Sequence, residues 1–170
     1  MKRLICILIF VLGFCSAGLA QEIAIESEFG TVYQRLIDAG WLAADCAAET
    51  VELDNAQTPV KYRARSEEQY AELIVTDEGQ AYQYGFGGFA DTVEDLTLCI
   101  GACTTADADK IAQEPYQAYS DSAAYQKEHR SEDAFSPRGM IIRDDIRYEL
   151  SQGWLFVMDI NIEREFLKEK

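Results

Sequence analysis

Apolar residues in the first half of this chain recur with helical spacing at two places. The pattern over residues 31–40 predicts a helix that ends at Gly40. A second helix is predicted from Thr92, because Asp91 and Glu94 form a capping box at its start. Four residues at helical spacing then form its core face: Val93, Leu96, Ile100 and Cys103.

Strict alternation of apolar and polar residues predicts strands elsewhere in this half. Residues 60–65 alternate throughout, and a shorter strand is predicted at 50–53. The segments 71–76 and 81–86 predict a hairpin, with Gly79 at a turn position that requires a left-handed backbone.

The stretch from 104 to 135 has a less regular pattern. One helix is predicted near 106–113, where Pro115 stops it, and another at 121–129.

The last third of the chain gives stronger signals. A helix is predicted at 144–151, ended by Gly153, and a strand at 154–162, followed by a short terminal helix. One face of that strand collects apolar residues: Phe156, Met158, Ile160 and Ile162. Together the elements predict an α+β fold, a small mostly antiparallel sheet of four or five strands with helices packed on one face.

The first twenty residues have the layout of a secretory signal. Two basic residues precede an apolar run at 4–14, and small residues follow up to Ala20. We therefore expect residues 1–20 to be a cleaved signal peptide. Residues 21–170 are then a single exported α+β domain, periplasmic or secreted.

The same segment bears on membrane attachment. The apolar run is about half as long as a membrane-spanning helix requires, so no membrane span is expected. Cys15 leaves a lipid anchor open, but the bulky Phe14 before it departs from a lipoprotein signal. Soluble export is the favoured interpretation.

The charge of the chain restricts its partners. The net charge is −15, and removal of residues 1–20 leaves 13 basic and 30 acidic residues, a net charge of −17. Such a charge repels nucleic acid and anionic lipid, and it attracts a basic protein. The oligomeric state has no signature in the sequence.

The cysteines provide the firmest chemistry. Two leave with the predicted signal, and Cys46, Cys99 and Cys103 remain in an oxidising compartment, where a disulfide is expected. Cys99 and Cys103 are four residues apart on one predicted helix, so Cys46 is expected to pair with one of them. That bridge would contribute about 4 kcal/mol through the loop it closes. The alternative is a thiol-redox or metal site formed by Cys99 and Cys103.

Two rows of side chains are candidate binding residues. The aromatic stripe of Tyr82, Tyr84 and Phe86 would stack against sugars or a partner protein if it were exposed, and would be core if it were buried. Lys61, Arg63 and Arg65 form the only basic row, which we call the basic row of residues 61–65. It is expected either to pair with carboxylates on the same sheet, such as Glu72, or to hold an anionic ligand.

No catalytic, cofactor or metal motif is present in the sequence. His129 lies in a polar stretch, and the carboxylate pairs at 107–109 and 144–145 lack the pattern of a calcium loop, so they could hold calcium only weakly. We therefore expect an exported, acidic, non-enzymatic binding protein. One version is an inhibitor or immunity-type partner of a basic envelope protein.

Overall fold

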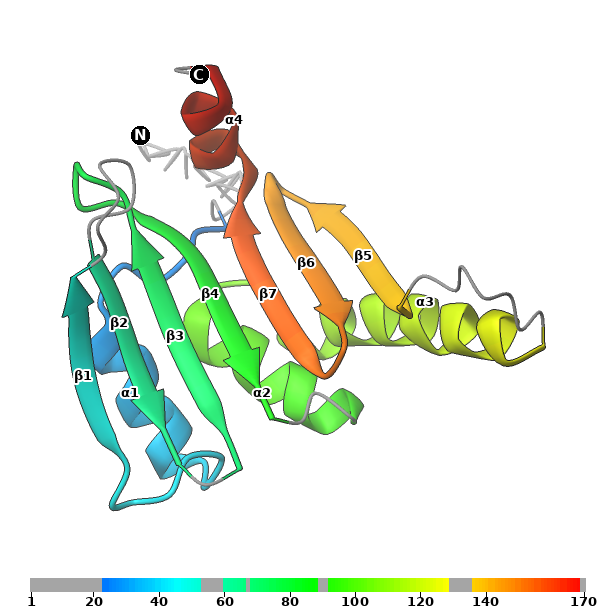
Figure 1. Cartoon of the computed structure of the whole chain (residues 1–170), viewed down its shortest axis with the longest axis horizontal. Coiled ribbons are helices and arrows are strands. Elements are labelled where there is room, and N and C mark those ends of the chain that lie inside the picture. The colour runs from blue at the N-terminus through cyan, green and yellow to red at the C-terminus, as the bar shows by residue number, and fades with distance from the viewer. Residues whose placement is uncertain (1–22, 53–59, 67, 89–91, 129–135, 169–170) are drawn as a thin grey trace, which may run out of the picture.

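A computed structural model describes residues 23–52, 60–66, 68–88, 92–128 and 136–168. In this part of the chain seven strands form one antiparallel sheet in the order β1-β2-β3-β4-β7-β6-β5 (Figure 1). The strands are β1 (Ala47–Glu52), β2 (Val60–Arg65), β3 (Tyr70–Val75), β4 (Ala81–Gly87), β5 (Arg138–Arg143), β6 (Ile146–Ser151) and β7 (Trp154–Asp159).

Three helices lie together on one face of the sheet, and a fourth extends from the end of β7 (Figure 1). They are α1 (Phe29–Asp38), α2 (Val93–Cys103), α3 (Ala108–Glu128) and α4 (Ile160–Lys168). The α+β class is therefore confirmed, whereas the predicted four or five strands were too few. Among the described residues, no helix is long and apolar enough to cross a bilayer.

The first half of the chain folds largely as its pattern predicts. Helix α1 ends just before Gly40, whose φ of +74° suits glycine, and the hairpin β3–β4 turns at Gly79 with a φ of +81°. The cap of α2 is shifted by one residue. Thr92 caps the helix by accepting a hydrogen bond from the Asp95 amide at 3.1 Å, while Asp91 lies outside the described residues.

The two helices predicted between 104 and 129 are a single helix, α3. Pro115 lies inside it and does not end it. The backbone of β5 at Gly139 packs directly on the turn that contains Pro115, so tertiary packing holds the helix together across the missing amide. His129 lies outside the described residues.

The predicted helix at 144–151 is wrong, because this stretch forms strand β6 between two tight turns. Asp144 and Asp145 have positive φ angles of 49° and 63°, as a two-residue hairpin turn requires. Gln152 and Gly153 repeat this geometry before β7, with φ angles of 52° and 76°. The apolar residues Ile146, Tyr148 and Leu150 also alternate with polar ones, which is the period of a strand, and the helix prediction overlooked this signal.

The strand predicted at 154–162 ends three residues early, at Asp159. The carboxylate of Asp159 accepts hydrogen bonds from the amides of Asn161 (2.9 Å) and Ile162 (3.2 Å). A side chain in this position caps a helix, so the chain leaves the sheet and begins α4.

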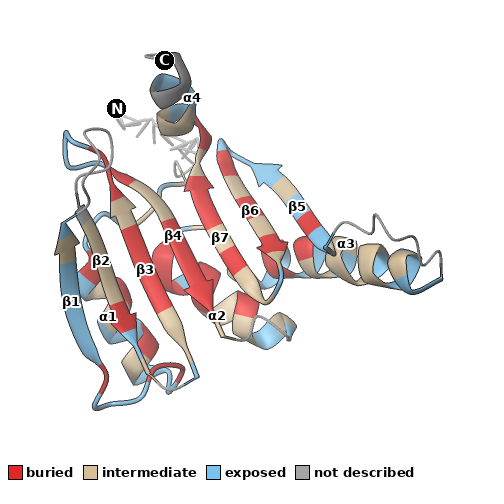
Figure 2. Cartoon of the chain, in the orientation of Figure 1, coloured by how far each residue is buried: buried red, intermediate tan, exposed pale blue. Residues whose placement is uncertain are grey.

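The core lies between the sheet and helices α1 to α3. Figure 2 shows that the central strands carry most of the buried positions, while the edge strands β1 and β5 are largely exposed. The largest fully buried side chains include Tyr84, Tyr148 and Phe86 from the strands and Leu36, Leu96 and Ile100 from the helices.

Candidate functional site

The side of the sheet opposite the helices, which we call the open face, is crossed by three rows of side chains. In register from β1 to β5, the first row is Ala47, Arg65, Tyr70, Gly87, Trp154, Ser151 and Arg138. The second row is Glu49, Arg63, Glu72, Gly85, Phe156, Glu149 and Met140. The third row is Val51, Lys61, Ile74, Gln83, Met158, Arg147 and Ile142.

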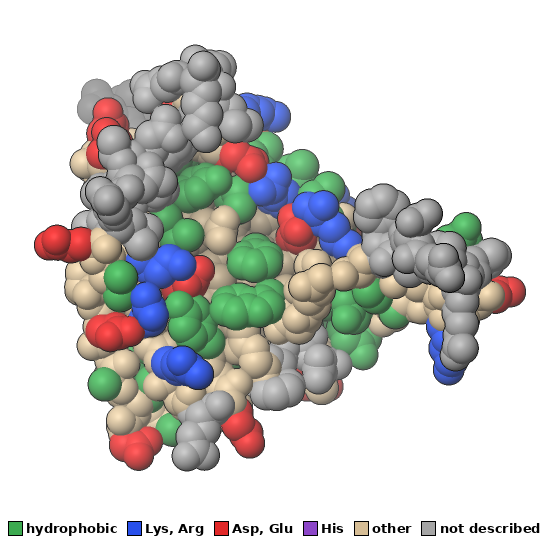
Figure 3. Space-filling view, viewed as in Figure 1, with side chains coloured by type: hydrophobic (Ala, Val, Ile, Leu, Met, Phe, Trp, Pro, Cys, Tyr) green, Lys and Arg blue, Asp and Glu red, His purple; other side chains and the backbone are tan. Residues whose placement is uncertain are grey.

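An aromatic cluster lies at the centre of the open face. It consists of Tyr70, Trp154 and Phe156, all of them partly exposed. The rings of Trp154 and Phe156 lie 5.9 Å apart and nearly parallel, at 8°. Tyr70 meets Trp154 edge to face, with ring centroids 5.3 Å apart. Figure 3 shows the resulting apolar patch at the centre of this face, with basic side chains on either side of it.

Two glycines of β4 make room for this cluster. A Cβ atom added at Gly87 would meet three atoms of the Trp154 ring at 2.6–2.7 Å, so the face of the indole lies directly on the glycine. A Cβ at Gly85 would lie 3.1 Å from Glu72 Cγ and 3.5 Å from the Phe156 ring. The absence of side chains at these positions allows the aromatic rings to lie across β4.

Gly87→Ala is expected to lift the indole of Trp154 from the sheet, because a contact of 2.6 Å cannot be accommodated. The ring of Trp154 then gains contact with water, so its fluorescence should shift to the red. Both the substituted protein and its parent lack Trp41 in this measurement, so that the emission comes from Trp154. Gly85→Ala is the matched control. Its Cβ contacts are tight but can relax, so the emission should stay close to that of the parent. A Gly87→Ala spectrum that does not change would contradict this packing.

The basic row of residues 61–65 lies on the open face, as its alternation predicts. Lys61 pairs with Glu72 at 2.8 Å, which confirms the predicted pairing across the sheet, and Arg63 pairs with Glu49 at 3.2 Å. Arg65 is exposed and forms no ion pair with another described residue. The charges of Lys61 and Arg63 are thus largely neutralised by carboxylates, and Arg65 is the residue of this row that remains available to bind a ligand or a partner.

Glu72 holds the basic row and the aromatic cluster together. Its side chain is 9 % exposed, and its carboxylate accepts a hydrogen bond from Tyr70 Oη at 2.8 Å and forms the ion pair with Lys61. Burial, together with the hydrogen bond to this carboxylate, raises the pKa of Tyr70 to about 12. Tyr70 therefore keeps its proton and stays a donor to Glu72 at any physiological pH.

A second group of ion pairs borders the cluster on the other side. Glu149 accepts from Arg138 at 2.7 Å and lies 3.8 Å from Arg147, which also binds Glu163 of α4 at 2.8 Å. The side chain of Glu149 is 13 % exposed and that of Arg138 is 56 % exposed. As with Glu72, the carboxylate lies low in the surface and the cation above it.

The aromatic stripe of the sequence prediction is not this cluster. Tyr84 and Phe86 point to the helix side, where they are 0 % and 1 % exposed, and Tyr82 is half-buried. The exposed-stripe interpretation is therefore wrong for Tyr84 and Phe86, and the core interpretation is confirmed. The signal for the real cluster was present in Gly85 and Gly87, which alternate with the stripe and leave the opposite face of β4 without a side chain at those two positions.

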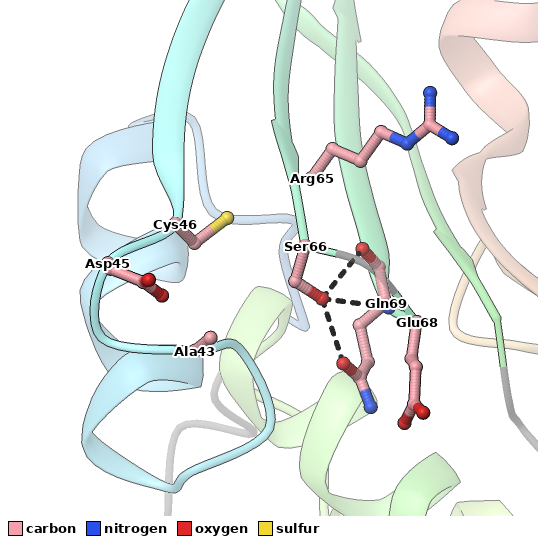
Figure 4. Close-up of a pocket in the computed structure, with 7 residues that line it drawn as sticks. All are labelled: Ala43, Asp45, Cys46, Arg65, Ser66, Glu68 and Gln69. Carbon is pink, nitrogen blue, oxygen red and sulfur yellow. Dashed lines mark hydrogen bonds between the residues drawn. The ribbon is translucent and has the colours of Figure 1, made fainter.

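A pocket of about 720 Å³ lies at the edge of the sheet where β1 begins and β2 ends (Figure 4). Its lining residues are Ala43, Asp45, Cys46, Arg65, Ser66, Glu68 and Gln69. Ser66 Oγ accepts from the Gln69 amide at 2.9 Å and fixes the tight turn into β3. In Figure 4 the side chain of Arg65 extends away from Cys46.

The predicted disulfide from Cys46 is not formed in this structure, where Cys46, Cys99 and Cys103 are buried free thiols. Cys46 lies at the start of β1, beside the backbone of Arg65, whereas Cys99 and Cys103 belong to α2. The sequence gives loop lengths and helical spacing but not the separation of these elements in space. Burial raises the pKa of all three thiols.

No group of three or more metal-ligating side chains exists among the residues that the structure describes. Asp107 and Asp109 are exposed at the start of α3, and Asp144 and Asp145 are exposed in the β5–β6 turn. The predicted signal peptide, residues 1–20, lies outside the described residues.

A comparison with known proteins found no family model, no curated relative and no solved structure that matches the chain.

Proposed function

We propose that this chain is an exported, non-enzymatic binding protein and that a partner protein docks on the open face of its sheet. The observation that carries the proposal is the aromatic cluster of Tyr70, Trp154 and Phe156. In the part of the chain that the structure describes, these rings are partly exposed at the centre of a face that is bordered by ion pairs.

The composition of this face is that of a protein interface. Such interfaces have an apolar centre rich in aromatic residues, a polar rim, and hot spots enriched in Trp, Tyr and Arg. The open face combines Trp154 and Tyr70 at its centre with four arginines around them, at positions 63, 65, 138 and 147. Many of the rim charges are already held in ion pairs, so their desolvation on docking is partly compensated.

Site-specific photo-crosslinking in the native cell envelope tests this proposal. A photoreactive amino acid at Ser151, beside Trp154 in the first row, should give a discrete adduct with another protein. That adduct should fall at least tenfold when Trp154 is replaced by alanine, because a central hot spot contributes 2 kcal/mol or more. The matched control places the same group at Gln117, which is exposed on α3. Adducts from Gln117 with none from Ser151 would contradict docking on the open face.

A basic envelope protein is the second candidate for the partner, and the net charge of −15 favours it. Opposite charge would speed encounter and make the association sensitive to salt. Such a partner would meet the acidic outer side of the molecule, where Asp109, Glu114 and Asp121 of α3 are exposed. The Gln117 adduct of the crosslinking experiment, lost in high salt, would identify this arrangement.

The thiol-redox alternative has less support in the geometry. Cys99 and Cys103 are 2 % and 0 % exposed, and burial raises the pKa of both thiols. Redox and soft-metal sites require an accessible thiolate. The low exposure of Cys99 and Cys103 makes them inaccessible, and their raised pKa disfavours the thiolate form.

A further inference from the structure

We infer that the segment docking on the open face is acidic and apolar, with an apolar side chain on Trp154 and carboxylates that meet Arg65 and Arg138. This inference rests on the proposed function and names the chemistry of its partner. It is the reverse of what the net charge of the chain alone predicts.

The open face presents cations although the chain as a whole is strongly acidic. Its three rows carry five basic side chains and three acidic ones, against 15 and 30 in the whole sequence. The basic side chains are Lys61, Arg63, Arg65, Arg138 and Arg147, and the acidic ones are Glu49, Glu72 and Glu149. A partner that approaches this face therefore meets a local excess of positive charge.

In the two ion pairs nearest the aromatic cluster the cation is more exposed than the carboxylate, which strengthens this excess. Glu72 is 9 % exposed and its partner Lys61 is 22 % exposed. Glu149 is 13 % exposed and Arg138 is 56 % exposed. The carboxylates lie underneath and the cationic groups on top, so the cations are what a docking segment can contact. Two other ion pairs do not follow this order, because Glu49 is more exposed than Arg63 and Glu163 is about as exposed as Arg147.

The first row of the open face places these groups in one line. Arg65 pairs in register with Tyr70 on β3, and Trp154 follows across Gly87, with Arg138 at the far end. Arg65 is exposed and has no ion-pair partner among the residues described, so its guanidinium is not already neutralised there. A bidentate carboxylate is the ligand that suits such a group best.

The strand spacing sets the length of the matching segment. Arg65 and Arg138 are separated by five strand spacings, or about 24 Å, which an extended chain of about seven residues spans. Trp154 lies between them, three spacings from Arg65 and two from Arg138. The segment should therefore carry an apolar residue between two acidic residues about seven positions apart.

A second copy of this chain is a poorer occupant. Each copy has a net charge of −15, so two copies repel each other, and stacking their open faces would bring arginines against arginines. A separate acidic segment experiences the same long-range repulsion, but physiological salt screens it beyond about 8 Å. At contact distance, the attraction between the guanidinium groups of the open face and the carboxylates of the segment then exceeds this repulsion.

Panning of random twelve-residue peptides tests the inference. The library is depleted on the Trp154→Ala variant and then selected on the wild-type protein at physiological salt. The expected enrichment is for Asp or Glu on both sides of an apolar residue. A synthetic copy of the strongest peptide should bind the Arg65→Ser variant at least tenfold more weakly. Lys127→Ser, an exposed position on α3, is the matched control and should bind as the wild type does.

The outcomes separate the two proposals. Trp154-dependent peptides that carry Lys or Arg would overturn the acidic partner and leave docking on the open face intact. Peptides that bind the wild type and the Trp154→Ala variant equally, or no enrichment, would count against both. Self-association of the wild-type protein that Arg65→Ser abolishes would overturn the separate partner and assign the face to a second copy. Because Arg65 is exposed, its replacement is expected to leave the fold intact, which thermal unfolding verifies.

Discussion

Replacing Gly139 by alanine is expected to destabilise the fold by about 3 kcal/mol or more, a large part of the stability of a typical domain. A Cβ atom at this position would overlap the carbonyl oxygen of Pro115 and lie 2.6 Å from the amide nitrogen of Tyr119. Both atoms belong to the backbone of α3, so no side-chain rotation relieves the clash. Chemical denaturation of the variant and the parent measures the difference in unfolding free energy.

Gly30→Ala is the matched control for this substitution. Gly30 is exposed in α1, and nothing lies within 4 Å of an added Cβ atom. Alanine is more favourable than glycine in a helix, and Gly30 lies in the first turn of α1, so this variant should be as stable as the parent or more stable by up to about 1 kcal/mol. If Gly139→Ala and Gly30→Ala changed the unfolding free energy by equally small amounts, the close approach of β5 to α3 would be contradicted.

The same contact shows why the sequence predicted two helices where the structure has one. Pro115 is a strong local signal for a helix end, and Gly139 is too distant in sequence to modify that signal. The helix continues because a glycine more than twenty residues later lets a strand pack against the turn at Pro115. Packing between distant segments is not encoded in a local pattern.

The strands were predicted best where alternation and turn residues agree. The hairpin β3–β4 has both, with Gly79 in its turn. Strand β6 has the alternation of Ile146, Tyr148 and Leu150, but its turns consist of Asp144–Asp145 and Gln152–Gly153, which are weaker hairpin signals than Asn-Gly. Missing β5 and β6 accounts for the shortfall in the predicted strand number.

The candidate site was predicted in part. The alternation of residues 60–65 places the basic row on one face of β2, and the pairing of Lys61 with Glu72 followed from their expected positions in the sheet. The aromatic cluster could not be assembled in the same way. Its members come from β3 and β7, and only the strand order brings Tyr70 and Trp154 to either side of Gly87.

Alkylation of the thiols under native conditions is expected to be nearly absent, and under denaturing conditions complete, in protein expressed from Gln21. Without reductant, denaturation should expose three reactive thiols, Cys46, Cys99 and Cys103, because the structure has all three as free thiols. Intact mass after iodoacetamide treatment counts the adducts. One adduct instead of three, rising to three after reduction, would contradict the free-thiol state, and a peptide map that places Cys46 in the bridge would restore the predicted pairing.

The order and pH dependence of native alkylation follow from burial. Cys46 is 8 % exposed and lines the pocket at the end of β2, so it should react before Cys99 and Cys103, which are 2 % and 0 % exposed.

Burial raises the pKa of each folded thiol, while unfolded thiols keep an ordinary pKa of 9.0. Below that pH both states hold the proton and the fold loses nothing. As the pH rises above it, only the unfolded state ionises, so stability falls and alkylation accelerates. Near pH 7 the thiols lack both exposure and thiolate character, which explains how an odd number of free cysteines is compatible with the predicted oxidising compartment.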